Sequence, residues 1–126
     1  MEFRNSDSIA SYSPESDTIT VSPDVTEQDL ESFQELSSRG WFSQPNPVLH
    51  EYAKRCHFLM SPGSYSKPPP FSDEQRSLVS RSVSAYAGTS VPAFVAEYLA
   101  GRLSGLAYSQ PVRELISEVT NGEISL

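Results

Sequence analysis

The residues best suited to chemistry in this chain are His50, Cys56 and His57, which fall within one short segment. Thiols and imidazoles supply nucleophiles, bases and metal ligands. Neighbouring residues on a helix point about 100° apart, so His57 is badly placed to act as a base for Cys56. The two histidines share a side but lie two turns apart, which is too far for joint ligation of one metal ion. Cys56 falls on an apolar stripe, where a buried, inert thiol is the ordinary interpretation.

Carboxylates offer a second set of candidates, at Asp73, Glu74 and Glu97. Asp73 and Glu74 fall in the first turn of a predicted helix, where the helix dipole favours negative charge, so no acid–base role is needed to explain them. Glu97 lies in the most apolar segment, and a carboxylate there is usually paired or functional. We expect Arg102 or Arg81 to neutralise it.

Motifs that would identify a reaction are missing from the sequence. It contains no zinc-ligand spacing, no glycine-rich phosphate loop and no Gly-x-Ser-x-Gly turn. We therefore predict no catalytic, cofactor-binding or metal-binding residues, and we expect that the protein is not an enzyme.

Charge divides the chain into two parts. Residues 1–40 hold nine acidic residues against two arginines, whereas residues 41–126 hold seven of each sign. Residues 1–24 are rich in Ser, Thr and Asp, and they offer too little apolar surface to offset the entropy of ordering, so we expect an arm that is disordered or ordered by a partner. Within it, residues 17–21 alternate β-branched residues in the manner of a strand that could extend a partner's sheet.

From Val25 onward, helix caps and apolar residues at three- and four-residue spacing predict about five short helices. Their expected spans are 26–40, 46–61, 72–88, 90–105 and 109–122. The fold class is therefore all-α: a small helical bundle over residues 25–122, preceded by the extended acidic N-terminal arm at 1–24 and followed by a tail at 123–126. In the second helix, the stripe expected to face the core is Val48, Leu49, Tyr52, Ala53, Cys56, Leu59 and Met60.

Function, on this reasoning, lies in contacts with another protein or with further copies of the chain. Aromatic residues outside a core are enriched at binding hot spots, although they also cap the ends of helical bundles. The candidate contact residues come from the arm, from the connectors and from one helix: Ile19, Val21, Trp41, Phe42, Phe58, Tyr65, Pro69 and Phe71. The leading hypothesis is a small helical adaptor, regulator or assembly subunit that uses the arm and the proline-rich connector.

Two alternatives stay open. The first is a small helical enzyme or ligand-binding bundle with a pocket near Glu97, lined also by Tyr52, Tyr86 and Tyr98. A histidine with a strongly shifted pKa in a pocket would favour it. The second is a helix–turn–helix binder of nucleic acid, but its recognition helix would offer only Arg113 against two glutamates, so nucleic acid is an unlikely partner.

The remaining expectations concern location and modification. A single cysteine excludes an internal disulfide and favours a reducing compartment. No secretory signal and no membrane-spanning run is apparent, so we expect a soluble, intracellular protein, cytoplasmic or nuclear. Ser13, Ser22 and Thr26 match short phosphorylation motifs. Basic residues at positions 54–81 could receive the acidic arm or an acidic partner.

Overall fold

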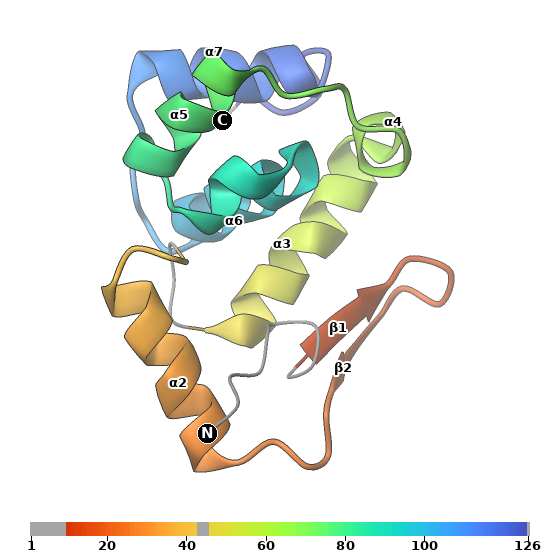
Figure 1. The fold of residues 1–126 in the computed structure, drawn as a ribbon. Helices are drawn as coiled ribbons and strands as arrows, with labels where there is room; N and C mark the ends of the chain where they lie inside the picture. Colours follow the sequence, from red (N-terminus) through yellow and green to blue (C-terminus); the bar gives the residue numbers. More distant parts are fainter. Residues whose placement is uncertain (1–9, 43–45, 126) are drawn as a thin grey trace.

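A computed structural model describes residues 10–42 and 46–125 and shows a mostly helical protein (Figure 1). Within these residues there are six α-helices, one short 3₁₀ helix and a two-stranded sheet. The elements are β1 (Ala10–Ser13), β2 (Thr18–Val21), α2 (Glu27–Ser38), α3 (Pro47–Met60), α4 (Pro62–Ser66), α5 (Asp73–Ser82), η1 (Tyr86–Thr89), α6 (Val91–Leu103) and α7 (Gln110–Val119). The predicted helical character is confirmed, and the all-α class is corrected by the sheet.

The sheet is an antiparallel hairpin in which Ala10 faces Val21 and Ser13 faces Thr18. The strand predicted around residues 17–21 is therefore present, but it pairs with β1 of the same chain rather than with another protein. The hairpin lies beside α3 (Figure 1). Arg55 on α3 donates hydrogen bonds of 2.9 and 3.2 Å to the two carboxylate oxygens of Asp17. Residues 1–9 of the predicted arm lie outside the described residues.

The predicted helix caps account for where most helices begin and end. The Thr26 hydroxyl accepts from the Asp29 amide while the Asp29 carboxylate accepts from the Thr26 amide, a reciprocal capping box. Ser72 and Gln75 make the same pair at the start of α5. Gly40 takes a positive φ of 84° after α2, as a left-handed helix stop requires. Local sequence therefore fixes these boundaries.

Two boundaries differ from the prediction. Pro62 begins the extra short helix α4, where only a connector is expected, because proline is well suited to the first helical turn. The helix expected to reach Gly88 ends at Ser82, and the chain folds back as η1. A side-chain carbon at Gly88 would lie only 1.9 Å from Ser80 Oγ, so this glycine allows η1 to approach α5 closely.

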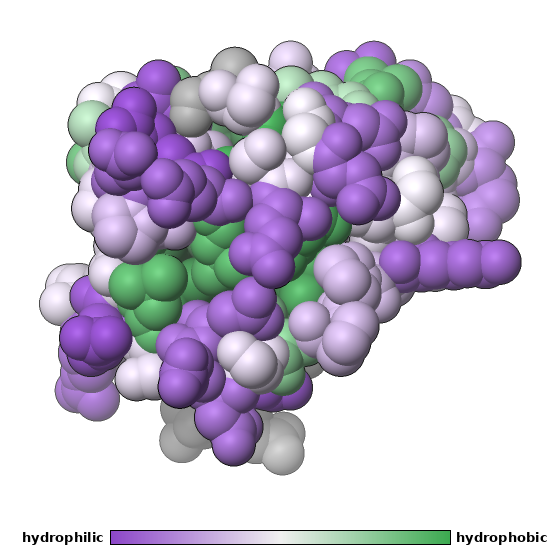
Figure 2. All heavy atoms as spheres, turned by 90° about the horizontal axis from the view of Figure 1, so that it is seen from above, coloured by the Kyte–Doolittle hydropathy of each residue, from purple (hydrophilic) through white to green (hydrophobic). Residues whose placement is uncertain are grey.

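The core is built around α6, whose residues from Ala93 to Gly101 are all buried. Helices α3, α5 and α7 surround it (Figure 1). On α7 the predicted stripe is confirmed, because Val112, Leu115, Ile116 and Val119 are all buried. This helix is amphipathic in the usual sense. Seen from above, the molecule presents a largely hydrophilic face, with hydrophobic residues showing in a central hollow and in smaller patches near the edges (Figure 2).

A second, smaller cluster attaches α2 to this core. The rings of Phe33 and Phe42 stack with centroids 4.2 Å apart, and Tyr86 packs against Phe42 at 5.3 Å. Backbone hydrogen bonds join Ala85 to Gly40 and Tyr86 to Trp41, both 2.9 Å long. None of the helices in residues 10–42 and 46–125 combines the length and apolar character needed to cross a membrane.

Candidate functional site

Helix α3 carries the clearest departure from the predicted pattern, because its polar residues face inward. His50, Glu51 and His57 are at most 2% exposed. Of the predicted stripe, Ala53 is buried, but Leu59 is 55% exposed. The other outward-facing apolar residues of α3 are Val48, Tyr52 and Met60. The stripe predicted to face the core is thus wrong for most of its members.

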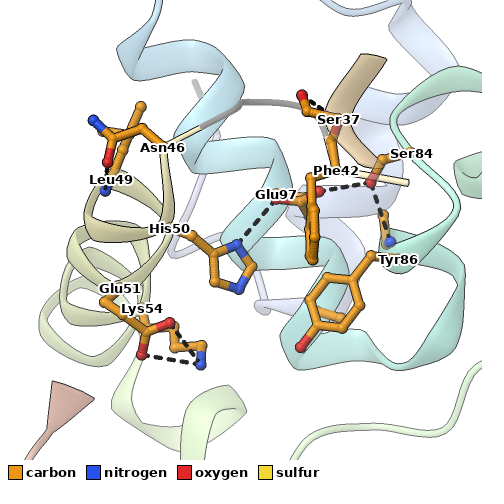
Figure 3. Close-up of polar contacts among 12 residues, drawn as sticks. Ser37, Phe42, Asn46, Leu49, His50, Glu51, Lys54, Ser84, Tyr86 and Glu97 are labelled. Carbon is orange, nitrogen blue, oxygen red and sulfur yellow. Dashed lines mark hydrogen bonds and ion pairs between the residues drawn. The ribbon is translucent and has the colours of Figure 1, made fainter. Parts of the chain in front are cut away.

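Glu97 holds α3 against α6 through a buried network (Figure 3). Its Oε2 lies 3.0 Å from His50 Nδ1, and its Oε1 accepts a 2.9 Å hydrogen bond from Ser84 Oγ. Ser84 Oγ in turn accepts from the Ala87 amide. A carboxylate that holds a histidine at Nδ1 fixes the ring and leaves Nε2 for proton transfer or ligand binding. His50 Nε2 is buried and has no hydrogen-bond partner among the described residues.

The arginines expected to neutralise Glu97 do not do so. Arg102 and Arg81 are both exposed. Arg102 donates instead to the carbonyl of Leu106, and Arg81 donates to the carbonyl of Ser77. The physical reason is the direction of the Glu97 side chain, which points toward α3. There His50 is its partner in place of an arginine. Glu97 therefore has a structural partner as expected, but that partner is His50 and not an arginine.

His57 belongs to a separate network at the other end of α3. Its Nε2 lies 2.6 Å from Ser64 Oγ on α4, and Ser64 Oγ lies 2.8 Å from Ser61 Oγ. Ser61 Oγ donates to Glu123 near the C-terminus. Burial lowers the pKa of His57 to about 4, because desolvation disfavours the charged imidazolium. His57 is therefore neutral at physiological pH.

The two histidines thus serve different networks, in agreement with the two-turn separation seen in the sequence. Among residues 10–42 and 46–125, no three His, Cys, Asp or Glu side chains come together as metal ligands would. Sequence reasoning missed Ser61, Ser64 and Ser84 as the partners of these groups. Serine is too common for residue type alone to reveal them. Ser64 meets His57 only because α4 folds back beside α3, and Ser84 meets Glu97 across thirteen residues of chain.

A cavity of about 330 Å³ opens between α3, α4, η1 and the start of α6. It is lined by Lys54, His57, Tyr65, Tyr86, Ser90, Pro92 and Ala93. Of the pocket residues expected from the sequence, Tyr86 lines this cavity. Glu97 lies in the network described above, Tyr52 is exposed, and Tyr98 is buried with its ring stacked on Tyr108. The cavity therefore differs from the expected one in place and in lining.

A second, mostly apolar groove lies between the C-terminal halves of α3 and α6. It has a volume of about 190 Å³ and is lined by Cys56, Met60, Leu99, Arg102 and Leu103. Cys56 is partly buried rather than fully buried. Desolvation raises the pKa of its thiol, which keeps it protonated and weakly reactive at neutral pH. This agrees with the inert thiol expected from the sequence.

The predicted contact residues divide between surface and interior. Val21 on β2 and Trp41 after α2 are exposed, whereas Ile19 is partly buried. Phe42 is only 4% exposed and belongs to the stack on Phe33, so it caps the bundle instead of presenting a contact surface. For this residue the interpretation as an exposed hot spot is wrong.

The other predicted aromatics are partly buried and pack within the chain. Phe58 contacts Tyr12 and Tyr65. Phe71 packs near Phe94 of α6. Pro69 is also partly buried. In the connector, Phe71 thus packs against the core. Partner binding by these residues stays a prediction.

The three predicted phosphorylation positions already take part in local hydrogen bonds. Ser13 Oγ donates to Glu15, Ser22 Oγ donates to Asp24, and Thr26 Oγ1 caps α2. Modification at these positions stays a prediction.

Comparison with known proteins adds no family to this description. No protein-family model matches the chain, and neither a curated protein nor a solved structure is significantly similar to it.

Proposed function

We propose that this chain is a non-enzymatic protein-interaction module whose contact surface lies on α3 and α6. The observation that carries the proposal is the apolar groove between α3 and α6, whose lining includes the exposed side chains of Met60 and Leu103. We call this the α3–α6 surface: the groove together with the exposed side chains that lie next to it in sequence, Leu59 before Met60 and Leu106 after α6. Exposed apolar surface of this kind marks interaction sites in soluble domains.

The free energy that burial of the exposed leucines would contribute supports a docking role. Leu59 and Leu103 are each more than half exposed. Full burial of a leucine contributes about 1.5–3 kcal/mol, so leaving several of them in water forgoes stabilisation that a partner would recover. The apolar groove beside them gives a partner side chain a place to insert, as central anchors do at interfaces.

The charged residues of α3 and α6 indicate which kind of partner would fit this surface. The two carboxylates on α3 and α6, Glu51 and Glu97, are both buried. Of the cationic residues on these helices, Lys54 pairs with Glu51 and Arg55 pairs with Asp17, so Arg102 is the cation beside the groove. Arg102 lines the groove itself. We therefore assign as partner an amphipathic helix whose apolar stripe fills the groove and whose flanks carry carboxylates.

Two designed helical peptides test this proposal. They share one leucine stripe and differ only in carrying glutamate or lysine beside it. We expect the glutamate peptide to bind at least about tenfold more tightly, a difference of about 1.4 kcal/mol. Leu103→Asp should abolish binding, and Arg102→Glu should remove the preference for glutamate, both measured by fluorescence anisotropy.

Val21→Asp is the matched control, because it places the same charge on an exposed apolar residue of the hairpin. It should leave peptide binding unchanged. Equal binding of both peptides, or an equal loss in the Val21 and Leu103 variants, would contradict the proposal. Sedimentation of the unliganded protein serves as a further check: a dimer that Leu103→Asp dissociates would make a second copy the occupant and would also contradict the assignment.

The other parts of the interaction hypothesis are retained as secondary proposals. The acidic hairpin already engages Arg55 through Asp17, so it would restrict this edge of the α3–α6 surface until a partner competes for the arginine. A nucleic-acid role has less support, since the exposed face of α7 carries Glu114 and Glu118 beside Arg113.

A further inference from the structure

The cavity between α3, α4, η1 and α6 lies apart from the α3–α6 surface and shares none of its lining residues. Its volume of about 330 Å³ falls at the lower end of the range for ligand pockets. Two tyrosine rings, from Tyr65 and Tyr86, and the apolar Pro92 and Ala93 form part of its walls. A flat, largely apolar molecule of modest size would fit such walls.

Electrostatics in the cavity favours an anion. Lys54 is its one formally charged lining residue at neutral pH, because His57 is neutral there. The N-terminal turn of α6 also borders the cavity through Ser90, Pro92 and Ala93, and a helix N-terminus carries partial positive charge. Glu51 pairs with Lys54 at 3.0 Å and is fully buried, so it offsets part of this charge without lining the space, and a bound carboxylate would share the Lys54 ammonium with it.

A second observation, next to the cavity, is the unpartnered nitrogen of His50, a residue that does not itself line the cavity. Figure 3 shows its Nε2 directed away from Glu97, toward the space between Lys54 and Tyr86, two residues that line the cavity. His50 is 2% exposed, and Nε2 has no partner among the described residues. A buried polar atom without a partner costs about 1–3 kcal/mol.

From these features we infer that the cavity binds a small organic carboxylate with a flat, apolar body. The carboxylate would lie by Lys54 and the N-terminus of α6, and the body would lie against Tyr65 and Tyr86. This site is independent of the proposed docking of a partner helix, since no lining residue is shared.

Benzoate, benzamide and inorganic phosphate are suitable probes, titrated into the full chain and followed by amide NMR. We expect benzoate to give saturable shifts at Tyr65, Ser90 and Ala93. Benzamide has the same shape without the charge, so it should bind about tenfold more weakly or worse. Phosphate has the charge without the flat body and should also bind more weakly.

The substitutions must respect the buried Glu51. Lys54→Met alone would remove the ion-pair partner of that carboxylate and destabilise the fold. The double variant Glu51→Gln/Lys54→Met removes both charges and should fold, as circular dichroism would show, while losing the preference for benzoate over benzamide. Ala93→Leu fills the cavity from α6 and provides a second variant, which should abolish benzoate binding. Lys67→Met is the matched control on the surface and should bind benzoate normally.

Failure of this inference is distinct from failure of the proposed function. No saturable shift with benzoate, equal affinity for benzamide, tighter binding of phosphate or unchanged benzoate binding in Ala93→Leu would each overturn it. Leu103→Asp, which removes the docking surface, should retain benzoate binding. A loss of binding there would also count against a separate site.

Discussion

Helices α3 and α7 bury opposite kinds of side chain. On α7 the apolar residues, such as Leu115 and Ile116, face the core while Glu114 and Glu118 remain in water. On α3 the histidines His50 and His57 face inward, and apolar residues such as Leu59 face outward. Both sequences show apolar residues at helical spacing. Spacing therefore indicates a helix in each case, but it does not by itself indicate which face the helix buries.

The difference arises from what each helix meets. Burying an apolar side chain is favourable against almost any packed surface, whereas burying a polar one is costly unless it finds a hydrogen-bond partner. On α3 those partners are Glu97 of α6 for His50 and Ser64 of α4 for His57. Polar residues of α3 can then face inward beside Ala53, and several of its apolar residues, such as Leu59, are left exposed.

The strongest test of this comparison is removal of Glu97. Glu97→Ala would leave His50 Nδ1 and Ser84 Oγ buried without the carboxylate, and each buried polar group that loses its partner costs about 1–3 kcal/mol. Urea unfolding would measure the change. Glu118→Ala, on the exposed face of α7, is the control and should change stability by no more than about 0.5 kcal/mol. A loss below about 1 kcal/mol in Glu97→Ala would show that the inward polar face of α3 does not hold the fold.

A matched pair of truncations probes the apolar residues of the two helices. Ile116→Ala on α7 should cost about 2–5 kcal/mol, because it opens a cavity in the core. Leu59→Ala on α3 should cost about 0.5 kcal/mol or less, because that side chain is already more than half exposed. Similar costs for the two variants, measured by thermal unfolding, would mean that Leu59 belongs to the core.

The pH dependence of stability reports on His57. Its pKa falls from 6.5 in the unfolded chain to about 4 when buried, so between these pH values the unfolded state binds more protons. Stability should therefore decrease as pH is lowered from 6.5 towards 4, by at most about 1.4 kcal/mol per pH unit from this group. His57→Gln retains a hydrogen-bonding side chain and should flatten the curve over that window. Parallel curves for the two proteins would contradict the assignment.

The smallest expected effect concerns Cys56, on the border between the two faces of α3. Burial raises the pKa of its thiol, so less thiolate is present at pH 7 than in an unfolded chain. We expect a maleimide to react more slowly with Cys56 in the native protein than in urea, by about a few fold or more. Equal rates would show that this position is open to solvent.

Much of the secondary structure could be predicted from short-range patterns. The capping boxes at Thr26 and Ser72 and the left-handed Gly40 act within a few residues, so the local sequence suffices to place them. The early end of α5 could not be predicted in this way. After Ser82 the chain folds back as η1, and Gly88 then lies close to Ser80 of α5, a tertiary contact that local spacing does not indicate.

The candidate sites could be predicted only in part. The sequence singled out Glu97, His50 and His57 by residue type, and it proposed aromatic contact residues by their place outside the expected core. It did not reveal that His50 pairs with Glu97, that Phe42 is buried, or that Lys54 and Tyr86 border one cavity. Each of these contacts joins residues from different elements.

The amino-acid sequence alone determined the helical character of this protein, most helix ends and the identity of its unusual polar residues, because these depend on interactions along a few neighbouring positions. Only the tertiary structure decided which face of α3 is buried, and with it the location of the α3–α6 surface and the cavity. The physical reason is that the free energy of burying a polar group depends on a partner, and that partner is supplied by a distant part of the chain.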